Sequence, residues 1–89
     1  MQGFFFVDEF KNLAFLTLGQ TRRIKHLLYE QNMKVVTLIL ADGQEEFLIT
    51  EIEKPVHEAL LQNNRCHITD QNEQDNIGQD YMVPVILTG

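Results

Sequence analysis

Residues 8–19, DEFKNLAFLTLG, decide between the two folds that this 89-residue chain permits. As a strand, Leu13–Leu18 pairs back on the apolar stretch Phe4–Val7 and leads into the next element. As a helix, the segment has Asp8 as its N-cap and ends at Gly19. The apolar stripe of that helix would comprise Phe10, Leu13, Ala14 and Leu18. Periodicity over so short a run does not separate the two interpretations, and we favour the strand.

The clearest local signal is a hairpin in residues 34–52, KVVTLILADGQEEFLITEI. A β-branched run ends at Asp42-Gly43, and a second apolar run, Phe47–Ile49, follows it. Asp-Gly between two such runs predicts a tight turn, because glycine accepts the positive φ that the turn requires. The first run, residues 35–40, is almost continuously apolar, which predicts a strand inside a sheet with both faces covered.

Two segments have the features of helices. Residues 21–32, TRRIKHLLYEQN, begin with the candidate cap Thr21. Residues 55–64, PVHEALLQNN, place Pro55 in a first helical turn, where its missing N–H is tolerated. The apolar stripes are expected to comprise Ile24, Leu27 and Leu28 in the first helix, and Val56, Ala59 and Leu60 in the second.

The remaining elements complete the predicted fold. Residues 65–69 and 81–87 are expected to be strands, and Pro84 confines the second of these to a sheet edge or a bend. The order β-β-α-β-β-α-β-β predicts an α+β fold in a single domain, residues 1–89: a mainly antiparallel sheet of four to six strands with two helices, ferredoxin-like or related. If residues 8–18 are helical instead, a winged-helix-like fold is the alternative.

The composition is that of an ordinary globular protein, with 44% hydrophobic and 22% charged residues. A single cysteine excludes an internal disulfide framework, and the apolar runs fall short of the ~20 residues that a membrane helix needs. We expect no signal segment, because the apolar run Phe4–Val7 is short and acids follow it. We therefore expect a soluble, cytoplasmic protein that does not act at a membrane. The net charge of −6 is uneven, with bases concentrated in residues 11–34 and acids in residues 42–58.

The predicted helix 21–32 has a basic face. At 100° per residue, one side of it carries Arg22, Lys25, His26 and Tyr29, opposite the apolar stripe. Cations beside an aromatic side chain suit phosphate contacts and base stacking, or an acidic protein partner. These four residues are the candidate macromolecule-binding site, and a solvated outer face is the plainer interpretation.

Few residues of the sequence are candidates for catalysis or metal binding. Cys66 and His67 are adjacent on a predicted strand and point to opposite faces, so they form no nucleophile–base pair. Cys66 is therefore expected to be a packed thiol. The histidines and the cysteine lack metal-site spacing, and we expect no catalytic residue, no metal and no cofactor. Asp8 directly follows an apolar strand, the place where small ferredoxin-like nucleases hold Mg²⁺, so a metal-dependent nuclease is kept as an alternative.

These features predict a small non-catalytic regulatory or accessory protein that binds another macromolecule, with a protein as the first expectation. Its size and acidity are typical of small proteins that bacterial, phage and mobile-element genomes encode. Homodimerisation through Phe4–Val7 or residues 81–87 is expected, because a small sheet gains burial by pairing its edges. A nucleic-acid-binding protein that uses the basic face of residues 21–32 is the alternative from a different class, although the net charge of −6 argues against it.

Overall fold

The computed structural model of the protein describes residues 2–18, 23–49, 53–70 and 81–89. Among these residues the chain forms seven strands and one short helix, so the prediction of a ferredoxin-like α+β fold with two helices is wrong. The elements are β1 (Gln2–Val7), β2 (Leu13–Leu18), β3 (Ile24–Glu30), β4 (Val35–Leu40), β5 (Gly43–Leu48), α1 (Lys54–Gln62), β6 (Arg65–Asp70) and β7 (Tyr81–Thr88). No helix in these ranges has the length and apolar character that crossing a bilayer requires.

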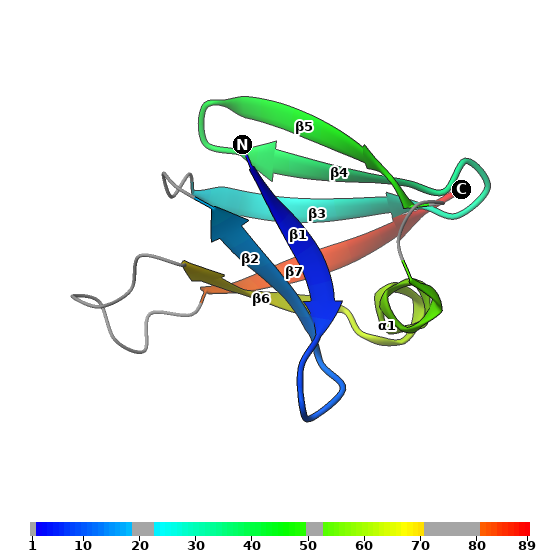
Figure 1. Ribbon diagram of the computed structural model, residues 1–89. Coiled ribbons are helices and arrows are strands. Elements are labelled where there is room, and N and C mark those ends of the chain that lie inside the picture. The colour runs from blue at the N-terminus through cyan, green and yellow to red at the C-terminus, as the bar shows by residue number, and fades with distance from the viewer. Residues whose placement is uncertain (1, 19–22, 50–52, 71–80) are drawn as a thin grey trace.

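The strands form one mixed sheet in the order β1-β2-β6-β7-β3-β4-β5. β2 runs parallel to β6 and β3 runs parallel to β7, whereas all other neighbours are antiparallel. The sheet curls into a half-barrel, and α1 packs against β1 and β2 (Figure 1). The two edges of the sheet are therefore β1 and β5.

Residues 13–18 form the second arm of a hairpin, as the favoured interpretation predicted. β1 pairs with β2 along its whole length, and Phe5 lies opposite Phe15. The connecting turn is built around Asp8, whose Oδ1 accepts the backbone N–H groups of Phe10 at 2.9 Å and Asn12 at 2.8 Å. Because this segment is a strand, the winged-helix alternative is wrong.

The predicted helix at residues 21–32 is wrong, because residues 24–30 form the strand β3. A β-bulge between Ile24 and His26 inserts an extra residue, so Ile24 and Leu27 both point inward although they are three positions apart. That spacing imitates one turn of a helix. Beyond the bulge the ordinary strand alternation resumes, with Leu27 and Tyr29 buried and Leu28 half-buried. Neighbouring strands on both sides hold this segment extended.

Other local predictions are confirmed. β4 and β5 form the expected hairpin, with Leu40 opposite Gly43, so the loop is Ala41-Asp42, one residue earlier than predicted. Gly43 has a φ of 153°, a value that glycine adopts more readily than other residues. α1 lies where it was expected. Its buried residues are Val56, Ala59 and Leu60.

β7 has a different partner in each half. Tyr81–Pro84 pairs with β6, and Val85–Thr88 pairs with β3. β7 is therefore the strand at which β1-β2-β6 meets β3-β4-β5, and it lies inside the sheet rather than at an edge. Pro84 stands where the strand changes partner, and the N–H of Val85 donates to the carbonyl of Asn64 at 3.0 Å.

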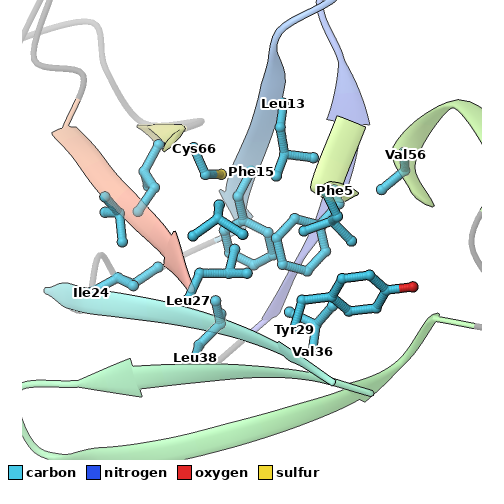
Figure 2. Close-up of a cluster of buried hydrophobic side chains, with 14 of the residues drawn as sticks. Phe5, Leu13, Phe15, Ile24, Leu27, Tyr29, Val36, Leu38, Val56 and Cys66 are labelled. Atoms are coloured by element: carbon cyan, nitrogen blue, oxygen red, sulfur yellow. The ribbon is translucent and has the colours of Figure 1, made fainter. Parts of the chain in front are cut away.

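The core fills the space inside the curl of the sheet (Figure 2). Phe5 and Phe15 are packed with ring centroids 4.7 Å apart, and Phe47 lies 6.2 Å from Phe15. Burying a ring as completely as those of Phe5 and Phe15 contributes roughly 1.5–3 kcal/mol to folding. The buried polar residue Thr17 is satisfied, because its hydroxyl donates to the carbonyl of Thr69 at 3.3 Å. The core thus joins both halves of the sheet.

Candidate functional site

The three described residues of the predicted binding site do not share a surface. Lys25 and His26 are exposed at the start of β3, whereas the side chain of Tyr29 is completely buried. Arg22 lies outside the described residues. The four residues were grouped on the assumption of a helix, and the strand with its bulge sends Tyr29 to the opposite side of the sheet from His26.

Tyr29 has a structural role in the described fold. Its hydroxyl forms a hydrogen bond with Nδ1 of His57 on α1, and the two rings are nearly perpendicular at 87°. Burial raises the pKa of Tyr29, because the apolar surroundings disfavour the phenolate. This contact fixes the helix to β3, so Tyr29 is not available for stacking on a base.

Asp8 and His67 form a polar pair at the outer surface of the sheet. Oδ2 of Asp8 lies 3.1 Å from Nε2 of His67, and both side chains are about one-fifth exposed, at 20% and 22%. The pKa of Asp8 is lowered, chiefly by the hydrogen bond from the backbone N–H of Asn12, with His67 and the N–H of Phe10 also contributing. An open pocket of about 410 Å³ adjoins the pair and is also lined by Arg65.

This pair lacks the geometry of an acid–base catalyst. Nε2 of His67 is engaged by Asp8 and Nδ1 is buried, so neither ring nitrogen is presented to a substrate. Both carboxylate oxygens of Asp8 have contacts within the protein. In the described ranges, no three side chains of His, Cys, Asp or Glu gather as a metal site would need. We therefore assign the pair a structural role: it connects the turn between β1 and β2 to β6.

Cys66 is a packed core residue. Its side chain is buried on the inner face of β6 beside Val83 of β7, and burial raises the pKa of the thiol to about 12. Sγ lies 3.5 Å from the carbonyl oxygen of His67, whose side chain points to the other face of the strand. A thiol with so high a pKa is protonated at neutral pH and is a poor nucleophile.

An apolar groove runs along the free edge of β1, and we call it the β1 groove. It has a volume of about 640 Å³ and is lined by the residues of β1 from Gly3 to Val7, by Phe47 and Leu48, and by Glu53, Pro55 and Val56 at the start of α1. Phe4 is half-exposed at 49%. The sequence predicts Phe4–Val7 as a candidate interface. It carries no signal for the groove residues from β5 and α1, because only the curl of the sheet brings them to β1.

The two edges of the sheet differ in how well they are protected against pairing with another strand. β5, GQEEFL, carries Glu45 and Glu46, and charges of this kind discourage pairing with another strand. β1, QGFFFV, has no charged residue and no proline. Natural sheets usually protect an edge with charge, proline or a bulge, and β1 has none of these. The unprotected edge is therefore the strongest candidate for an interaction site in the described part of the chain.

No family model, curated protein or solved structure matches this chain.

Proposed function

We propose that the protein is a small non-catalytic accessory or regulatory protein that binds a protein partner by strand addition at β1. The observation that supports this proposal is the uncharged edge of β1 beside an apolar groove. Among the described elements β1 pairs only with β2, so its other side offers backbone N–H and C=O groups to an added strand. The six residues of β1 span about 20 Å, which is the length of partner that the edge accepts.

The apolar lining of the β1 groove suits an extended segment with apolar side chains. β1 forms one wall, and Leu48 and Pro55 lie across from it. Phe5 and Phe47, with ring centroids 5.9 Å apart, pack beneath it. Every second side chain of an added strand would face these rings, so the partner segment is expected to have apolar residues at alternate positions.

The acidic residues near the groove indicate which sign of charge the partner segment should carry. Glu53 lines the groove and is exposed, and the exposed Glu9 lies in the turn that follows β1. A partner segment with Lys or Arg beside its apolar residues would complement these acids, whereas an acidic segment would be repelled. The occupant that fits is therefore an extended, alternating apolar segment with basic flanks.

The proposal is tested with two matched substitutions in the hairpin of β1 and β2. Phe4→Lys places a charge on the free edge, and Phe10→Lys places the same charge in the turn, where Phe10 is 75% exposed. Phe10→Lys is expected to change the free energy of unfolding by about 0.5 kcal/mol or less, and Phe4→Lys to lower it by about 1 kcal/mol, because half of the Phe4 side chain is buried. Wild-type and both variants are immobilised and offered an extract of the native host, and the retained proteins are identified.

We expect one protein to be retained by the wild-type and by Phe10→Lys but not by Phe4→Lys. With that protein purified, hydrogen exchange of the β1 amides should slow on binding, because an added strand accepts and donates backbone hydrogen bonds there. Equal retention by all three forms, or unchanged exchange in β1, would contradict strand addition at this edge.

The predicted homodimer is an alternative occupant of the same edge. In sedimentation equilibrium, a wild-type that is a monomer at micromolar concentration would support a foreign partner at this edge. A wild-type dimer that Phe4→Lys dissociates and Phe10→Lys does not would replace the foreign partner with a second copy of the chain.

A further inference from the structure

The parallel strands β3 and β7 pair along only half of their lengths. Ladder contacts join Leu27–Glu30 to Val85–Thr88. Before these positions, β3 pairs with β4 and β7 pairs with β6, so the first halves of the two strands diverge (Figure 1). The result is a notch in the sheet, formed by residues 23–26 and 81–83, which we call the β3–β7 notch.

The bulge in β3 concentrates positive charge at this notch. In a regular strand Lys25 and His26 would point to opposite faces, but the extra residue at the bulge leaves both side chains exposed. Arg23, directly before the strand, is also exposed. Two permanent cations and a histidine thus occupy four consecutive positions, and only Ile24 between them is buried.

An open pocket of about 510 Å³ lies in the notch. β3 contributes the basic side chains to its lining, and β7 contributes Tyr81, Met82 and Val83. Tyr81 is 51% exposed and Met82 is 60% exposed. None of the described residues that line the pocket is acidic, in a chain whose net charge is −6. Asp42, in the turn whose Ala41 N–H bonds to the carbonyl of Arg23, adjoins the notch without lining the pocket.

We propose that the β3–β7 notch binds a nucleotide, with its phosphate on Arg23 and Lys25 and its base stacked on Tyr81. Guanidinium and ammonium groups are the usual partners of phosphate oxygens, and an exposed tyrosine ring stacks on any base. The soft, flexible side chain of Met82 adapts to the edge of the ring. This proposal is independent of strand addition at β1, because the two sites share no residue. It keeps Lys25 and His26 of the sequence-based site and replaces the buried Tyr29 with Tyr81.

A nucleotide reaches such a site in two forms, as a free molecule or as one unit of a single strand. The experiment measures fluorescence polarisation of labelled oligo(dT) at low salt, with unlabelled ATP as the free-nucleotide competitor. If two phosphates are neutralised, the logarithm of the binding constant should fall with the logarithm of the salt concentration with a slope of about −1.4. Competition by ATP assigns the site to free nucleotides, and failure of ATP to compete assigns it to single strands.

Matched variants locate the binding. Lys25→Gln should reduce the salt slope by about 0.7, and Lys54→Gln, an exposed lysine on α1, should leave it unchanged. Tyr81→Ala should weaken binding by about 5- to 150-fold, which corresponds to about 1–3 kcal/mol for one stacked base, and Tyr81→Phe should preserve it. All of these side chains are exposed, and thermal melts establish that each variant is folded.

Three results would overturn the proposal. The first is no polarisation change with wild-type protein at low salt. The second is equal loss of binding in Lys25→Gln and Lys54→Gln, which would show diffuse attraction of a polyanion. The third is displacement of oligo(dT) by poly-glutamate as effectively as by unlabelled oligo(dT), because an acidic polypeptide has no base to stack on Tyr81.

Discussion

The two tyrosines of this chain allow a direct test of the fold. Tyr29 is completely buried on β3, and Tyr81 is half-exposed on β7. In the helix expected from the sequence, Tyr29 would face solvent beside Lys25. Replacing each tyrosine by alanine therefore gives different results in the two arrangements.

The loss of stability expected for Tyr29→Ala follows from the complete burial of the Tyr29 side chain. Removing a buried aromatic ring leaves a cavity and costs about 3–5 kcal/mol. A chain of 89 residues has a total stability of roughly 4–13 kcal/mol, so Tyr29→Ala should remove a large share of it. For a domain of this size each kcal/mol lowers Tm by about 4–8 °C, which gives a decrease of roughly 10–40 °C. Tyr81→Ala should change the free energy of unfolding by about 0.5 kcal/mol or less.

A more conservative substitution tests the hydrogen bond between Tyr29 and His57 alone. Tyr29→Phe keeps the ring and removes the hydroxyl that contacts Nδ1 of His57, so it should cost about 0.5–1.5 kcal/mol. Because this variant is expected to fold, the test remains decisive even if Tyr29→Ala is too unstable to purify.

Urea and thermal unfolding, followed by circular dichroism, measure these differences. We expect the order wild-type, Tyr81→Ala, Tyr29→Phe, Tyr29→Ala from most to least stable. Equal stability of Tyr29→Ala and Tyr81→Ala would refute the buried position of Tyr29, and with it the assignment of residues 24–30 to a central strand.

Three further predictions concern single residues. The thiol of Cys66 has an ordinary pKa of 9.0 in the unfolded chain and a pKa of about 12 in the folded protein, so folding favours its neutral form. As the pH rises between these two values, the free energy of unfolding should fall by about 1.4 kcal/mol per pH unit. Alkaline urea titrations should show this slope reduced in Cys66→Ala. The lowered pKa of Asp8, due first to the N–H of Asn12, means that its stabilising contribution is present above its ordinary pKa of 3.8 and is lost as the pH falls through the lower folded pKa. Acid unfolding should show a weaker pH dependence in Asp8→Asn, which retains an acceptor for the turn, and an unchanged dependence would contradict the assignment. Gly3→Ala should lower Tm, because an added Cβ would lie 2.4 Å from the backbone oxygen of Leu16; a Tm equal to that of the wild-type would show that β1 does not approach β2 as described.

Local pattern predicted most of the elements. The hairpin of β4 and β5 was found because glycine follows a β-branched run and turn geometry depends on adjacent residues. α1 was found because Pro55 marks its first turn and its buried residues recur at helical spacing. Alternation along β6 separated Cys66 from His67, and Cys66 is buried as expected. Each of these signals lies within about ten residues of chain.

The errors arose where a local pattern has two physical causes. Ile24 and Leu27 are three positions apart, which is the spacing of a helical stripe and also that of two inward residues on either side of a bulge. Only the neighbouring strands, β4 and β7, decide between them, and the residues of β7 lie far along the chain. The binding site that assumed a helix was consequently assembled from residues on opposite faces of a strand.

By itself, the sequence determined that a hairpin follows the apolar run 35–40, which residues are apolar enough to be buried, and that the segment Phe4–Val7 carries no charge. The tertiary structure alone decided that this segment is a sheet edge and that α1 and β5 complete a groove beside it. It also decided that Tyr81, rather than Tyr29, lies beside Lys25. The physical reason is that alternation and turn chemistry act between near neighbours, whereas strand order and curl depend on pairing between segments that are distant in the chain.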